Sequence, residues 1–350
     1  MKRINSEHNP SRIVYLDTIR FLAVLWVFHT HFIAAYAKTG WRNLLKIVPF
    51  KLVFQGVTGK LAVTVLCIVL GYLACKKGQS KTSTFQYAIR RYIYFFSIAL
   101  FLNTLYVILA KAEILPLASQ SLGIRQILYS SVFLKSNIVG LFWCLRPLYT
   151  ASLICFINGK YNLSYKEVLI ESVIFIFIKE TWIGIGILGN LAERLLQEEK
   201  VNSVMQKWYV QLVLIIAVSA SIKRSESNTT YLIDGICMMM VVMIIANNRW
   251  IKGALEFRWW QSCNKHYMGV FINHVIIYKL VTTYIFGGFS TGNRRPQVLL
   301  AYFICLVLII LLAGPIEYIV NKLVKVFISC LERFQTCYKA MHAKLKDNRQ

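Results

Sequence analysis

Four ionisable residues lie in the first apolar stretch of the chain, "YLDTIRFLAVLWVFHTHF" at residues 15–32. They are Asp17, Arg20, His29 and His31. An ionisable group inside hydrocarbon is costly and usually faces a cavity or a partner. Arginine grips phosphate through two parallel hydrogen bonds, and an imidazole near neutral pKa can take a proton from a hydroxyl. These residue types predict anion binding and general base catalysis within a membrane helix.

Helical spacing distinguishes the two histidines. Arg20 and His31 are eleven residues apart, which leaves them about 20° from alignment on one helix face and roughly 16 Å apart along the axis. Asp17 falls within about 60° of Arg20, whereas His29 lies about 200° from His31. The spacing predicts a polar face with charge at one end and imidazole well inside. An arginine that reaches the head groups and a histidine bonded within the bundle stay open as structural alternatives.

Composition indicates that membrane helices position these residues. Of the 350 residues, 57% are hydrophobic and 16% are charged, and the mean hydropathy is +0.54, whereas a soluble domain carries about a quarter charged residues. We therefore expect one all-α domain over residues 1–350, a polytopic integral membrane bundle of about ten transmembrane helices. A soluble enzyme with a single anchor is excluded. The expected spans centre on 20–37, 57–75, 91–110, 138–157, 167–178, 181–192, 208–222, 230–247, 267–287 and 298–320.

Two of these spans form one apolar stretch at 167–192 that is interrupted by Lys179 and Glu180. The stretch is compatible with one helix or with two short ones.

The nine cysteines form no CxxC pair and lie mostly in apolar runs. They are expected to be packed hydrophobes rather than disulfides or metal ligands, and no metal site is expected.

The net charge of +25 is interpreted as a topology signal. The basic residues flank apolar runs, where they face anionic lipid rather than nucleic acid. A cytoplasmic N-terminus puts 24 of the 40 lysines and arginines in cytoplasmic segments and 13 in outer loops. We expect a multi-pass plasma-membrane protein with both termini in the cytoplasm and a basic cytoplasmic tail at 324–350.

Further polar residues recur at span positions and predict a shared wet cavity. "YAIRRYIYFF" places two arginines at the cytoplasmic entry to the third span, which is also an ordinary topology signal. For the remaining residues, the structural alternatives are an anchor at the membrane interface for Arg146 and a hydrogen bond within the bundle for His274. The residues are Arg90 and Arg91 in that pair, Trp143 and Arg146 in "LFWCLRPLYTASLICF", and Tyr267, Asn273 and His274 in "YMGVFINHVIIYKL".

These elements, in this order, resemble the membrane acyltransferase-3 family. The family's first-helix signature is an aspartate, an arginine, ten residues and a histidine, which the chain carries as Asp17, Arg20 and His31. "VLCIVLGYLAC" resembles the second-helix element and "FQYAIRRYIYFF" the arginine-rich third-helix entry. "FWCLRPLY" is similar to the arginine form of the fourth-helix motif, and "YMGVFINH" to the late element that ends in histidine. The chain departs from the pattern at Leu70, where the family has serine, and lacks the proline after the third-helix arginines.

The resemblance implies an integral-membrane O-acyltransferase of the polysaccharide or capsule O-acetyltransferase type. Such an enzyme moves an acetyl group from cytosolic acetyl-coenzyme A to a hydroxyl of a surface polysaccharide or its lipid-linked precursor. His31 would be the general base, and Arg146 or His274 would stabilise the oxyanion or position the acceptor. The implied site residues are His31, Arg20, Asp17, Arg146 and His274 for catalysis, Arg20, Arg90 and Arg91 for the coenzyme, and Trp143, Tyr267 and Asn273 for the substrate.

Two alternatives remain open at this point. Within the same family, the acceptor could be a lipid or a small molecule. From another class, intramembrane histidine and arginine also fit a transporter of polysaccharide or another solute. The chain has no inverted repeat and no matching pair of broken spans, which disfavours the transporter. The expected partners are acyl-coenzyme A, the glycan and membrane lipid, with no nucleic acid and no metal.

Overall fold

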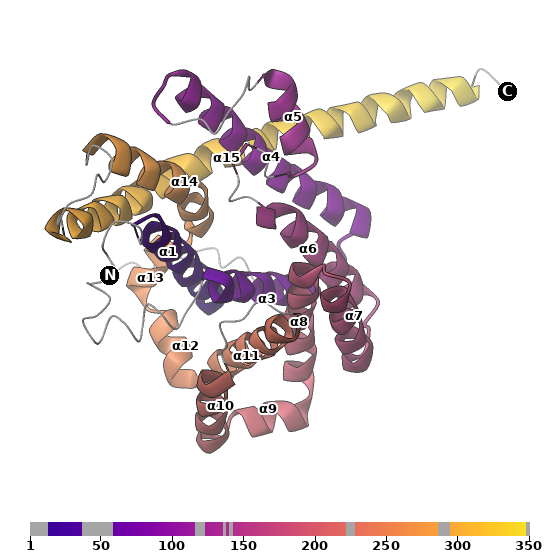
Figure 1. Cartoon of the computed structure of the whole chain (residues 1–350). Coiled ribbons are helices and arrows are strands. Elements are labelled where there is room, and N and C mark those ends of the chain that lie inside the picture. The colour runs from indigo at the N-terminus through magenta and orange to yellow at the C-terminus, as the bar shows by residue number, and fades with distance from the viewer. Residues whose placement is uncertain are drawn as a thin grey trace, which may run out of the picture.

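The computed structural model describes residues 13–36, 59–115, 123–135, 138–139, 143–221, 228–285 and 295–347. Every regular element in these ranges is helical, which confirms the predicted all-α class (Figure 1). The elements are α1 (Val14–Tyr36), α3 (Gly59–Gly78), α4 (Thr84–Lys111), α5 (Ile124–Val132), α6 (Leu145–Lys160), α7 (Tyr165–Phe177), α8 (Thr181–Gln197), α9 (Glu199–Met205), α10 (Trp208–Ser221), α11 (Asn228–Asn247), α12 (Arg249–Leu255), α13 (Arg258–Asn264), α14 (Tyr267–Leu280), the π-helical η4 (Val281–Ile285) and α15 (Arg295–Asp347).

Each expected span overlaps a helix, and residues 37, 57–58, 140–142, 222 and 286–287 of these spans lie outside the described residues. Fewer helices than ten are long and apolar enough to cross a membrane. In the described part of the chain, four meet both conditions, at 59–78, 84–111, 229–247 and 300–338. A fifth is possible if α9 and α10, bent by 80°, form one span. The count of about ten is therefore not confirmed. Helices such as α7 and α14, with 13 and 14 residues, are shorter than the roughly 20 residues that a straight crossing needs.

The apolar stretch at 167–192 forms two helices. The helices α7 and α8 are separated at residues 178–180, where Lys179 takes a positive φ of 70°. The hydroxyl of Ser172 donates to the carbonyl oxygen of Gly184 across the pair at 2.8 Å. A capping box of Ser164 and Glu167 starts α7. The interruption of helical backbone hydrogen bonding at residues 178–180, and not the apolar content of the stretch, therefore decides that two helices form here.

One half of the bundle is a close-packed layer of α3, α6, α8 and α11 (Figure 1). These helices run in the same direction, because contacts between them advance together along the chain. Trp182 of α8 lies beside Tyr231 of α11, and Leu188 lies beside Gly235 further along both. At their C-terminal ends, Arg194 of α8 donates to the carbonyl oxygen of Asn158 in the last turn of α6 at 3.0 Å.

The other half packs α14 against α1 and α15, and α4 against α15. Helices α1 and α14 run in the same direction, since Arg20 contacts Tyr267 and His31 contacts His274. Helix α15 runs the opposite way, since Asn273 donates to the carbonyl oxygen of Ile309 at 2.8 Å. We call the end of the bundle that holds Arg20 and Tyr267 the arginine end. The end where α1 finishes, next to the start of α3, is the histidine end.

Helix α15 continues through the segment predicted as a basic tail. It has 53 residues, contains Pro315, and projects well beyond the rest of the bundle (Figure 1). At 1.5 Å per residue it is roughly 80 Å long, far more than the hydrocarbon thickness.

All nine cysteines are free, and six are buried as predicted. Cys330 and Cys337 are exposed on this projecting part.

The contact between α3 and α8 leaves no room for a side chain at Gly71, because a Cβ there would collide with the carbonyl oxygen of Gly186. We expect Gly71→Ala to destabilise the purified protein by about 1–3 kcal/mol, the usual cost of overpacking a core. Thermal unfolding in detergent measures the effect. Gly253→Ala in α12 is the matched control, since nothing lies within 4 Å of its Cβ position and alanine favours a helix. Equal unfolding temperatures for the two variants would contradict the packing described.

Candidate active site

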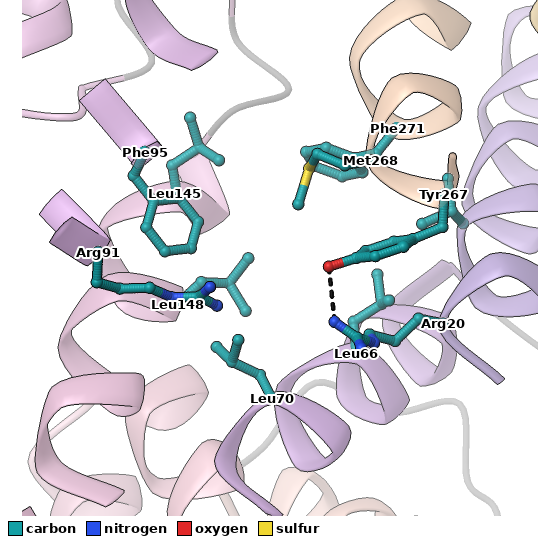
Figure 2. Close-up of a pocket in the computed structure, with 11 residues that line it drawn as sticks. Arg20, Leu66, Leu70, Arg91, Phe95, Leu145, Leu148, Tyr267, Met268 and Phe271 are labelled. Carbon is teal, nitrogen blue, oxygen red and sulfur yellow. Dashed lines mark hydrogen bonds between the residues drawn. The ribbon is translucent and has the colours of Figure 1, made fainter. Parts of the chain in front are cut away.

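A cavity opens between α1, α3, α4, α6 and α14 at the arginine end. Its empty volume, which includes space open to the outside, is about 440 Å³. Most of its lining is apolar, and its two cations face each other from opposite walls, Arg20 from α1 and Arg91 from α4 (Figure 2). The lining residues are Arg20, Val24, Leu66, Leu70, Arg91, Phe95, Leu145, Leu148, Tyr267, Met268 and Phe271.

Contacts on three sides hold the guanidinium of Arg20. Its Nη1 donates to the hydroxyl of Tyr267 at 2.7 Å (Figure 2), and its Nη2 pairs with the carboxylate of Asp17. The guanidinium carbon also lies 4.5 Å from the centre of the Tyr267 ring. Its Nε is buried and has no hydrogen-bond partner among the described residues. The arrangement fixes the cation in place at the cavity wall.

Arg91 joins this cavity, and its neighbour Arg90 does not. The guanidinium of Arg91 lies 4.9 Å from the ring centre of Phe95, and no carboxylate in the described part of the chain forms an ion pair with it. Arg90 lines a separate groove between α4 and α15, together with Glu332. Successive residues on a helix point about 100° apart, so the two arginines diverge. Where the structure describes it, the cavity lining holds two guanidiniums and no carboxylate, so the cavity favours an anion.

The two intramembrane histidines meet further along the same helix pair. The rings of His31 and His274 stack with centres 5.8 Å apart and planes 17° apart. Nδ1 of His274 lies 2.6 Å from the carbonyl oxygen of Phe271. A carbonyl can only accept, so Nδ1 carries the hydrogen and Nε2 keeps a lone pair. That Nε2 is buried with no partner among the described residues.

His29 lies on another face of α1, as helical spacing predicted. Its Nδ1 is 3.2 Å from the hydroxyl of Tyr302 on α15. His31 and Arg20 instead both face α14. The structure therefore separates a histidine bonded within the bundle from a histidine stacked on His274 beside the cavity.

The structure does not bring the fourth-span residues to the histidine pair. Arg146 is exposed and lines a second pocket of about 770 Å³ with Trp143 and Glu180. The preceding residue, Leu145, faces the first cavity, so α6 lies between the two sites. Asn273 is buried and packs α14 onto α15. A role for Arg146 in stabilising an oxyanion beside His31 has no support from this geometry.

Sequence reasoning overlooked three polar residues close to the arginine end. Tyr94 lies in the electrostatic field of Arg20, Arg91 and Glu317, three residues after Arg91 and hence on the same face of α4. Glu317 lies 3.5 Å from Nδ1 of His266. Glu317 is the only charged residue in the last apolar run, a signal that could have identified it. Among the described residues, no three His, Cys, Asp or Glu side chains form a possible metal site.

Comparison with known families places these elements in one domain. Residues 13–314 match the model of the acyltransferase-3 family, whose description is an acyltransferase domain. The matched region contains every predicted site residue from Asp17 to His274. No curated protein and no solved structure matches the chain.

The pairing of Asp17 with Arg20 can be tested by a double-mutant cycle. We expect Asp17→Asn and Arg20→Gln each to lower the unfolding temperature, since each leaves a partly buried charge without its partner. The double variant should lose less than the sum of the two, with a coupling of about 0.5–3 kcal/mol. Thermal unfolding of all four proteins gives the coupling. Asp17→Asn with Arg333→Gln, on the exposed part of α15, should be additive, and additivity for both pairs would contradict the contact.

Proposed function

The chain belongs to the acyltransferase-3 family, and from this premise we propose that it is a membrane O-acetyltransferase. It transfers the acetyl group of cytosolic acetyl-coenzyme A to a hydroxyl of a cell-surface polysaccharide or of its lipid-linked precursor. The observation that carries the proposal is the pairing of α1 with α14. This pairing sets Arg20 and His31, which share one face of α1, against Tyr267 and His274 of α14.

The arginine end suits the polyanionic part of coenzyme A. Arg20 and Arg91 face each other across the cavity, and guanidinium binds phosphate through paired, charge-assisted hydrogen bonds. Asp17 and Tyr267 orient Arg20 for this role. Arg90 would meet the coenzyme outside the cavity, at its own groove. In this proposal the arginine end, where α1 begins, faces the cytoplasm at the plasma membrane.

The histidine pair suits the proton transfer. His31 takes the proton of the acceptor hydroxyl, the oxygen attacks the thioester carbonyl, and the C–S bond breaks. The products are the O-acetyl ester and coenzyme A, whose thiolate receives the proton. His274 has its N–H bonded to Phe271, so in its neutral form it has no donor for an oxyanion. We assign it to holding the ring of His31 in orientation.

The role of His31 is tested by comparing surface glycan from cells that carry the wild-type protein, His31→Ala, His29→Ala or His274→Ala. Proton NMR of the glycan measures O-acetyl signals at matched membrane levels of each protein. We expect His31→Ala to lose the signal by 10²-fold or more, the usual contribution of a general base. His29→Ala should retain the signal, and His274→Ala should lower it.

Acetylation that persists in His31→Ala would overturn the assignment of the base. A wild-type protein that consumes acetyl-coenzyme A and leaves the glycan without acetyl groups would point to a lipid or small-molecule acceptor in the same family. A wild-type protein that neither binds nor consumes the coenzyme would contradict the transferase hypothesis and favour the transporter hypothesis.

Donor binding is tested separately at Arg20. We expect Tyr267→Phe to weaken acetyl-coenzyme A binding about tenfold, because it removes one hydrogen bond to a charged group while it keeps the aromatic ring. Arg20→Ala should weaken binding further. Isothermal titration of the protein in nanodiscs measures both. Tyr278→Phe, a half-buried tyrosine on the same helix, is the control, and equal losses in Tyr267→Phe and Tyr278→Phe would show that Tyr267 has no special role.

A further inference from the structure

A row of aromatic side chains crosses the histidine end of the bundle. Trp143 lies just before α6, Trp182 in the first turn of α8, and Tyr231 in the first turn of α11. The ring centres of Trp143 and Trp182 are 5.0 Å apart, and those of Trp182 and Tyr231 are 5.8 Å apart. We call these three residues the aromatic row. Since three parallel helices contribute one ring each, only the tertiary structure brings the row together.

The row ends in a cationic pocket on one side. Trp143 and Arg146 line this pocket together with Lys135 and Glu180. The guanidinium of Arg146 forms no hydrogen bond or ion pair with any described residue, whereas Nζ of Lys135 donates to the hydroxyl of Tyr129 at 2.8 Å. The pocket therefore presents one arginine with its donors available and one oriented ammonium.

On its other side the row leads toward the histidine pair. Nζ of Lys60, in the first turn of α3, lies 5.2 Å from the ring centre of Tyr231. The adjacent Gly59 packs against Thr30 of α1, with only 3.1 Å between its Cβ position and the methyl group of Thr30. The next residue on α1 is His31. Polar and aromatic groups thus form a path from Arg146 to the contact of Gly59 with Thr30, one residue before the proposed base.

The position of Trp182 argues that the row does not serve as a lipid anchor. Helix α8 packs on α3, α6, α7 and α11, and nearly all of its residues after the first turn are buried. Trp182 therefore lies at the end of an interior helix and is itself half-buried. Tryptophans at the membrane interface lie on the outer surface of a bundle, as Trp208 does with 73% of its surface exposed.

The chemistry of the path fits an acidic saccharide. Aromatic rings offer apolar faces for the C–H faces of sugar rings, and arginine pairs with carboxylate in a bidentate geometry. The N-termini of α3, α6, α8 and α11 all lie at this end, and their dipoles add positive potential. The carboxylate of Glu180 is available to accept from sugar hydroxyls.

We propose that the aromatic row, with Arg146 and Lys60 at its two ends, binds the acceptor as an extended acidic polysaccharide whose sugar units carry carboxylates. The proposal rests on the proposed function and names its substrate class. The charged units are held at Arg146 while a hydroxyl further along the chain reaches His31. Arg146 is then a specificity residue for the acceptor rather than a catalytic one.

The experiment measures binding of two oligosaccharide probes to the full-length protein in nanodiscs. Oligogalacturonate is the acidic probe, and an isomaltose oligomer of matched length is the neutral one. We expect the acidic probe to bind at least tenfold more tightly, with an affinity that falls as salt rises. Arg146→Gln should remove most of this preference, and Trp143→Ala should weaken both probes.

Matched controls come from the opposite end of the bundle. Arg249→Gln and Trp250→Ala alter an exposed arginine and an exposed tryptophan at the start of α12 and should bind as the wild type does. Unfolding temperatures confirm that all variants are folded. Equal affinity for the two probes, no binding of either, or equal effects of Arg146→Gln and Arg249→Gln would overturn the proposal. So would quenching of Trp143 and Trp182 by brominated lipid to the extent seen for Trp208, which would mark the row as a lipid anchor.

Consumption of acetyl-coenzyme A by the wild-type protein distinguishes failure of the acceptor proposal from failure of the proposed function. If the coenzyme is consumed and the acidic probe shows no preference, the acceptor assignment falls and the transferase stands. If the coenzyme is neither bound nor consumed, the proposed function falls.

Discussion

The structure depends on the pairing of α1 with α14. Helix α1 carries an arginine and a histidine on a face that must be buried in a bundle surrounded by hydrocarbon, where an unpaired charge or polar group is costly. Helix α14 meets both with groups of matching chemistry, a tyrosine hydroxyl for Arg20 and a second imidazole for His31. Both contacts lie on one pair of parallel helices. The helix position that forms the contact of Arg20 with Tyr267 therefore also brings His31 to His274.

The remaining helices serve this pair in two ways. Helix α15 holds α14 through the amide of Asn273 and the close contact of Gly269 with Ala313. The layer of α3, α6, α8 and α11 supplies the apolar far walls of the cavity and brings four helix N-termini to the histidine end. At the other end of that layer, Glu193 accepts from Gln79 and Gln197, so this carboxylate is bonded within the layer.

Two distinct surfaces result from this division. The arginine cavity is narrow, mostly apolar and cationic at its walls, which suits an anion attached to a slim arm. The path along the aromatic row is partly exposed, and it mixes aromatic, cationic and carboxylate groups, which suits a long polar chain. His31 stacks on His274 and directly follows Thr30, the residue of α1 that contacts the start of α3. In the proposed function, donor and acceptor would reach one base from opposite ends of the bundle.

The sequence by itself determined the all-α class, the positions of the helices and the face shared by Arg20 and His31. These follow from local periodicity, because residues eleven apart on any helix lie on nearly the same side. It also separated His29 from His31 on the same ground. Its count of spans was less secure, since apolar content does not reveal where a helix bends or stops, as at Lys179.

Only the tertiary structure decided which predicted residues meet. Adjacent arginines on α4 diverge into different pockets, and Arg146 faces away from the cavity that its neighbour Leu145 lines. Glu317 and Tyr94 join the arginine end from helices far apart in the chain. The aromatic row likewise combines residues 143, 182 and 231. The physical reason is that helix rotation and neighbour choice are set by packing between helices, and packing is a property of surfaces that no single segment carries.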